Sequence, residues 1–155
     1  MKLDANKLTD AVEAHKEEAV SLLRDLIRIP STRGNEGDAM RELQTRLDSV
    51  VDSAELISVS DDIQHDPDYS FKLDDFSYAD QPNLKVVKKG SGNGKSLIVN
   101  THLDVVPASP GQEGPFEGRI EDGVVFGRGA CDCKGQVATF FLALAALKEM
   151  GVELK

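Results

Sequence analysis

Cysteines and long apolar runs are scarce in this sequence, and each scarcity argues against a class of protein. There is no tryptophan, and the two cysteines, Cys131 and Cys133, are too few for a secreted disulfide framework. No stretch approaches the length of a membrane span, and the N-terminal residues lack the apolar core of a signal peptide. These features predict a cytoplasmic protein that does not bind membranes.

Basic residues are also in the minority, with 18 lysines and arginines against 27 aspartates and glutamates and a formal net charge of -9. Nucleic-acid binding requires a basic face for the phosphates, and no cluster in the sequence supplies one. Hydrophobic residues still make up 40% of the 155 residues, which is enough for one domain with a core. We therefore expect a globular domain without a nucleic-acid partner.

The period of the apolar pattern changes along the chain and predicts both helices and strands. Helices are expected at three stretches of helical period: 8–27, 40–51 with Asn35 as its N-cap, and 137–147. Strands are expected at 54–60, 84–88 and 96–101, and in a hairpin that turns at Asp122-Gly123. The acidic stretch 61–83 reads as a surface loop. The run 96–101 is apolar enough to be buried on both faces, so this pattern predicts an α/β fold with a central mixed sheet covered by helices.

The stretch GSGNGKS, residues 90–96, is either the end of a nucleotide-binding P-loop or a turn. A P-loop would need a glycine at position 89, which is Lys89, and a helix after Ser96. An apolar run with β-branched residues follows instead. The stretch therefore predicts a flexible turn between two strands.

Two polar side chains, His102 and Asp104, follow the apolar run 97–101. Residues two apart in an extended chain point to the same side, so the carboxylate can accept a hydrogen bond from one imidazole nitrogen and leave the other for a metal. A lone His-x-Asp is also typical of a loop or capping interaction. The two other histidines, His15 and His65, have no neighbours at ligand spacing.

Asp132 is the second candidate for a metal ligand and lies in GRGACDCKGQ, residues 127–136. Its carboxylate is placed either to bridge cations or to cap the helix that begins near Lys134. Cys131 and Cys133 flank it, and in an extended segment both point away from Asp132. Two cysteines also fall short of the four ligands of a structural zinc site. We interpret both as buried, small hydrophobic residues.

The order of these motifs resembles the zinc-dependent acetylornithine deacetylase, succinyl-diaminopimelate desuccinylase and glutamate carboxypeptidase family. The motifs are SLIVNTHLDVVP and then GPFEGRIEDGVVFGRGACDCKG, followed by an apolar helix. The resemblance implies that His102 is a zinc ligand, that Asp104 orients it, and that Asp132 bridges two zinc ions, often before a cis peptide bond. It also implies hydrolysis of an amide bond in a small N-acyl amino acid or peptide substrate, by a deacylase or carboxypeptidase type of reaction. Cobalt and manganese suit histidine and carboxylate ligands as well as zinc does.

The sequence departs from the family in several respects, two of which bear on the metal site. Where the family usually has Asp-Met-Lys-Gly-Gly, this chain has Cys133 and Gln136 in place of the methionine and the last glycine. The family's general-base glutamate, its other ligands and an inserted dimerisation domain come later in longer chains, whereas only Glu149 and Glu153 follow as acids here. We therefore expect residues 1–155 to be the N-terminal portion of a zinc-hydrolase catalytic domain, inactive until a C-terminal part or a second copy in a homodimer completes it.

Two other interpretations remain open from the sequence. One is a non-catalytic, truncated protein that binds a partner through an exposed sheet edge or is vestigial. The other is a small metal-binding module that uses His102, Asp132 and the two cysteines.

Overall fold

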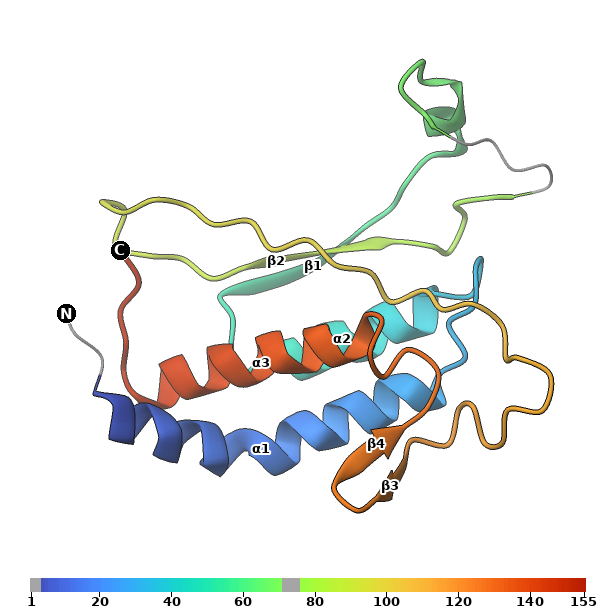
Figure 1. The fold of residues 1–155 in the computed structure, drawn as a ribbon. Helices are drawn as coiled ribbons and strands as arrows, with labels where there is room; N and C mark the ends of the chain where they lie inside the picture. Colours follow the sequence, from blue (N-terminus) through green and yellow to red (C-terminus); the bar gives the residue numbers. More distant parts are fainter. Residues whose placement is uncertain (1–3, 71–75) are drawn as a thin grey trace.

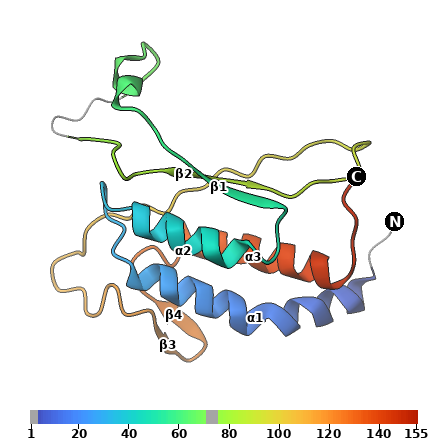
Figure 2. The ribbon, with the colours of Figure 1, turned by 180° about the vertical axis from the view of Figure 1, so that it is seen from behind.

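Residues 4–70 and 76–155 are described by the computed structural model, and they form three α-helices and two small antiparallel sheets (Figures 1 and 2). In chain order the elements are α1 (Ala5–Arg28), α2 (Gly37–Leu47), β1 (Ser53–Ile57), the 3-10 helix η1 (Asp61–His65), β2 (Asn83–Val87), β3 (Arg119–Glu121), β4 (Val124–Phe126) and α3 (Lys134–Glu149). This arrangement confirms the α/β class.

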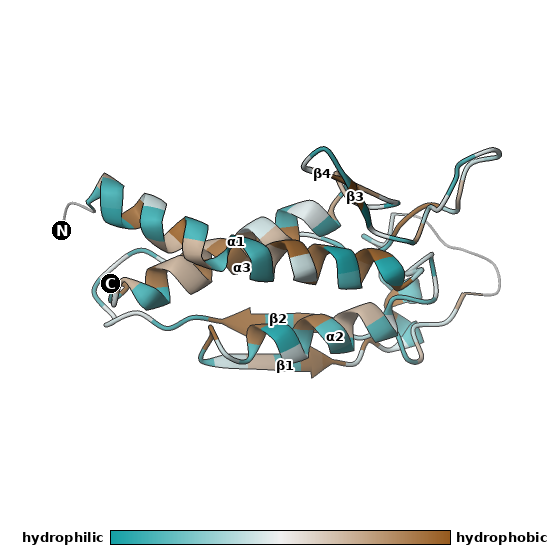
Figure 3. Cartoon of the chain, turned by 90° about the horizontal axis from the view of Figure 1, so that it is seen from below, coloured by the Kyte–Doolittle hydropathy of each residue, from teal (hydrophilic) through white to brown (hydrophobic). Residues whose placement is uncertain are grey.

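The helix α1 covers the expected stretch 8–27 and starts earlier, at Ala5. The Asp4 carboxylate accepts hydrogen bonds from the backbone amides of Asn6 and Lys7, at 2.9 and 3.4 Å, and so caps the first turn. Pro30 follows the last turn and cannot continue the helix. In Figure 3, hydrophilic and hydrophobic residues alternate along α1, as an amphipathic helix requires.

The core lies among the three α-helices, of which α1 and α3 pack along each other (Figure 1). Leu22 and Leu26 of α1 are fully buried, as is Phe141 of α3. Burial of each such side chain stabilises the fold by about 1.5–3 kcal/mol. The two helices run in opposite directions, so this packing brings the first turn of α3 to the C-terminal end of α1.

The strands form two separate pairs. β1 and β2 are antiparallel, with Ser53 opposite Val87 and Ile57 opposite Asn83. β3 and β4 form the expected hairpin, in which Asp122 and Gly123 have positive φ angles of 49° and 78°, as a two-residue hairpin turn requires.

The expected buried strand over residues 96–101 is not formed. Leu97 and Ile98 are 85% and 89% exposed, and the stretch has no ladder partner among the described residues. The sheets are accordingly smaller than one central mixed sheet, because β2 pairs with β1 and residues 96–101 pair with no strand of the described part.

Two other expectations need adjustment. Asn35 does not cap α2: the cap position is Glu36, which makes no side-chain cap bond, and the Asn35 amide donates to Thr32 Oγ1 instead. The loop expected over 61–83 contains η1, and its residues 71–75 lie outside the described part.

Within residues 4–70 and 76–155, no helix is both long and apolar enough to cross a membrane.

Candidate metal centre

The segment that carries His102 and Asp104 is fixed beside the chain that leaves α1. The Ser31 hydroxyl donates to the Leu103 carbonyl at 2.6 Å, and the Val105 amide donates to the Ser31 carbonyl at 2.9 Å. Leu103 is 1% exposed and anchors the segment in the core, while the side chains on either side of it face outward. The alternation expected of an extended chain therefore holds at this point.

Lys134 fixes the turn that carries Asp132. Its side chain is completely buried, and Nζ donates to the carbonyls of Leu26 and Ile29 at 2.7 and 2.9 Å. Burial lowers the pKa of Lys134 to about 8. Sequence reasoning used Lys134 only to mark the start of a helix. A lysine in the first turn of an otherwise apolar helix is the signal that could have shown its buried role.

The structure brings His102, Asp104 and Asp132 together. The His102 Nδ1 atom lies 3.0 Å from Asp104 Oδ1 and 3.2 Å from the Asp104 carbonyl oxygen. Two acceptors at Nδ1 favour the tautomer with the proton there, which leaves a lone pair on Nε2. Nε2 lies 3.2 Å from Asp132 Oδ1. Two donor atoms suited to a metal thus converge on one exposed spot.

Cys133 joins this group, contrary to its expected orientation. Its sulfur lies 3.0 Å from Asp132 Oδ1, and ligand atoms of His102, Asp132 and Cys133 all lie within 4.8 Å of one another. The alternation argument fails because the segment is a turn: Cys133 has φ -119° and ψ 12°, which is not an extended conformation. Cys133 is half-buried and Cys131 is exposed, so neither is the fully buried residue that was expected.

The Cys133 thiol also affects the pKa of the neighbouring Asp132. It donates a hydrogen bond to the Asp132 carboxylate, which is the main reason that the pKa of Asp132 lies below its usual value; His102 lowers this pKa further when its imidazole is protonated. The same hydrogen bond raises the pKa of the Cys133 thiol. Asp132 does not act as the helix cap, because the cap position is Cys133 and no side-chain cap bond forms. The peptide bond between Asp132 and Cys133 is cis, as the family resemblance implied.

Comparison with known proteins shows which protein family the chain resembles. Residues 98–155 match the model of peptidase family M20/M25/M40. The chain is 31% identical over 152 residues to a succinyl-diaminopimelate desuccinylase of Gluconacetobacter diazotrophicus, covering 96% of this chain and 34% of that protein. Residues 98–155 therefore resemble the peptidase family M20/M25/M40.

A second relative supports this resemblance. The chain is 28% identical over 151 residues to an N-formyl-4-amino-5-aminomethyl-2-methylpyrimidine deformylase of Halalkalibacterium halodurans, covering 92% of this chain and 31% of that protein. The chain therefore spans about a third of the length of the curated relatives it matches.

The divalent metals used by family M20/M25/M40 suit the donor atoms in this group. Imidazole nitrogen and carboxylate oxygen bind zinc at about 2.0–2.2 Å, and tetrahedral angles then place two donors roughly 3.4 Å apart. The Nε2 to Oδ1 distance of 3.2 Å meets this requirement with little movement. His102 and Asp132 are 48% and 83% exposed at their side chains, so an ion can reach them from solvent.

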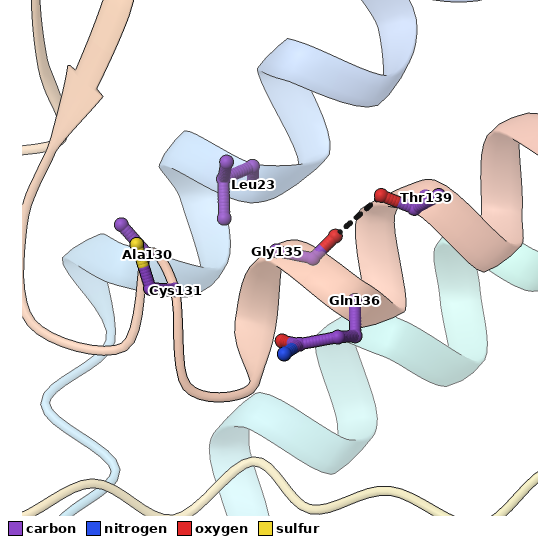
Figure 4. A pocket seen from close by; sticks show the side chains of 6 residues that line it. All are labelled: Leu23, Ala130, Cys131, Gly135, Gln136 and Thr139. Carbon is purple, nitrogen blue, oxygen red and sulfur yellow. Dashed lines mark hydrogen bonds between the residues drawn. The ribbon is translucent and has the colours of Figure 1, made fainter.

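Figure 4 shows a separate surface pocket, lined by Leu23, Ala130, Cys131, Gly135, Gln136 and Thr139. Neither His102 nor Asp132 nor Cys133 lines this pocket. Cys131 therefore belongs to a different surface from Cys133, although only one residue separates them in the sequence.

The other two histidines lie apart from the cluster. His15 pairs with Glu149 at 2.8 Å and with Glu18 at 3.4 Å, and His65 ends η1. Neither belongs to a group of potential ligands within the described residues.

Proposed function

We propose that the chain forms the N-terminal portion of the catalytic domain of a metal-dependent amidohydrolase. The reaction is hydrolysis of an amide bond in a small N-acyl amino acid or dipeptide-like substrate. The observation that carries this proposal is the convergence of His102 Nε2 and Asp132 Oδ1, 3.2 Å apart, with Asp104 behind the imidazole. The names of both relatives support it, since desuccinylase and deformylase each denote removal of an acyl group.

In this proposal each of the three residues has a separate task. His102 and Asp132 hold a zinc ion, for which cobalt or manganese can substitute. Asp104 accepts a hydrogen bond from the Nδ1–H group of His102, which keeps the Nε2 lone pair directed at the ion and raises the basicity of the imidazole. The bound ion supplies polarisation of the substrate carbonyl and activation of water.

The same proposal assigns the general base to another part of the protein or to a second copy. Among the described residues, the carboxylates that pair with His102 are Asp104 and Asp132, and both are engaged as orienting group and ligand. A general base must be within hydrogen-bond reach of the water it deprotonates. We therefore expect the 155-residue chain alone to bind metal without hydrolysing N-acetyl or N-succinyl amino acids.

A calorimetric zinc titration of the 155-residue chain tests the ligand assignment. His102→Ala and Asp132→Asn are each expected to weaken zinc binding on the order of 100-fold, because each removes one of few protein ligands. His65→Ala is the matched control, since it removes a histidine that lies outside the cluster. Zinc affinity unchanged in His102→Ala would contradict the site, and hydrolysis by the chain that is lost in His102→Ala would contradict the assignment of the base.

The variant Asp104→Asn tests whether Asp104 orients the His102 imidazole or instead stabilises the fold. The Asp104 side chain is 53% exposed, so its replacement leaves the packing of the core intact. We expect zinc affinity to fall by roughly 10–100-fold, as is typical when the partner of a ligating histidine is removed, with an unchanged thermal unfolding midpoint. If the variant unfolds at a much lower temperature, Asp104 has a structural role instead.

A further inference from the structure

We propose that Cys133 is a third protein ligand of this metal ion, and that its thiolate makes the site prefer zinc and cobalt over manganese and magnesium. This inference rests on the proposed metal site and goes beyond it in the ligand set and the selectivity. Methionine is usual at this place in the motif of the family that the sequence resembles, whereas this chain carries a thiol.

The geometry places three different donors around one point. Asp132 Oδ1 lies 3.2 Å from the imidazole Nε2 and 3.0 Å from the Cys133 sulfur. All three ligand atoms fall within 4.8 Å of one another, although they come from two segments that are about thirty residues apart in the chain. Three protein ligands with a position left open is the number typical of a catalytic zinc site.

The thiol hydrogen bond marks the direction in which an ion would bind. The Cys133 thiol now donates its proton toward Asp132 Oδ1, so the sulfur and the oxygen already face each other. On binding, the S–H bond breaks, the proton goes to the solvent, and a sulfur–metal bond of about 2.3 Å forms for zinc. No electrons are transferred in this step.

A thiolate changes which ion the site selects. Imidazole and carboxylate alone serve zinc, cobalt and manganese, whereas a soft thiolate ligand favours zinc and disfavours the hard ions manganese and magnesium. Only one of the two cysteines lies near the other ligand atoms. Cys131 is exposed and lines the separate pocket of Figure 4. Selectivity is therefore expected to depend on Cys133 and not on Cys131.

Cobalt spectroscopy of the 155-residue chain tests the ligand directly. Addition of cobalt is expected to give a thiolate-to-cobalt charge-transfer band in the near ultraviolet, which remains in Cys131→Ser and disappears in Cys133→Ser. Zinc affinity is expected to fall on the order of 100-fold in Cys133→Ser, with a smaller loss for manganese. Cys133→Met restores the residue usual in the family and is expected to lose the band while the protein stays folded.

Thiol alkylation gives a second measurement that needs no variant. Zinc is expected to slow iodoacetamide modification of Cys133 and leave that of Cys131 unchanged, as measured by peptide mass spectrometry. Cobalt binding that depends on His102 but gives no charge-transfer band would overturn the thiolate ligand and leave the proposed function standing. If neither zinc nor cobalt binds the wild-type chain, both proposals fail.

Discussion

Replacing Lys134 by alanine is expected to lower the free energy of unfolding by about 3–5 kcal/mol. The side chain is fully buried, and Nζ donates to two carbonyls at the end of α1. Hydrogen bonds from a charged donor contribute about 1.5–3 kcal/mol each, and the removed methylenes leave a cavity. Relief from burying an ammonium group offsets part of this loss. Urea unfolding followed by circular dichroism measures the difference.

Two further variants divide this loss into its causes. Lys134→Met keeps most of the apolar volume and removes only the donor, so it should lose about half as much stability as alanine does. The Leu26 and Ile29 carbonyls retain the backbone amides of Ile29 and Ser31, at 3.3 and 2.8 Å. Lys16→Ala, on an exposed ion pair, should be nearly neutral. A stability of Lys134→Ala equal to that of wild type would show that burying the ammonium cancels its contacts.

Gly135→Ala is expected to lower both stability and metal affinity. A Cβ atom at this position would lie 2.2 Å from the Ala130 carbonyl oxygen, a backbone atom that cannot rotate away. The turn before α3 must therefore move, at a cost of roughly 1–3 kcal/mol for overpacking. Since that turn carries Asp132, its carboxylate moves relative to His102, and zinc should bind at least about tenfold more weakly.

The control for this variant is the neighbouring residue. Gln136 is exposed on the same helical turn, so Gln136→Ala should leave the urea midpoint and the zinc affinity unchanged. Alanine is intrinsically better than glycine in a helix by about 1 kcal/mol, which acts against the predicted loss. If Gly135→Ala proved more stable than wild type, the close approach to Ala130 would not constrain the turn.

The elements that the sequence predicted correctly are those whose ends or turns are set by residues within the element itself. Pro30 ends α1, and the Asp122-Gly123 pair turns the hairpin, because each residue restricts its own backbone. The shared side of His102 and Asp104 was also predictable, since it requires only an extended chain between them.

The features that sequence reasoning missed depend on distant residues or on an unforeseen turn. The carbonyl partners of Lys134 lie 108 and 105 positions away in the chain, and no local pattern reports them. The Cys133 sulfur faces Asp132 because the backbone turns where an extended segment was assumed. The run 96–101 has the composition of a buried strand, but burial requires neighbours, which the composition of a strand does not specify.

The uncovered run from Leu97 to Val99 has a consequence for how the chain behaves at high concentration. Three consecutive apolar residues there are 85%, 89% and 53% exposed, in an extended segment without a ladder partner among the described residues. Such a segment is a template on which a strand of another molecule can add, and it combines high β-propensity with no charge. Lys95 and His102 flank it as gatekeepers against aggregation. We therefore expect the colloidal stability of this chain to depend on a stretch that ends three residues before the proposed metal ligand His102.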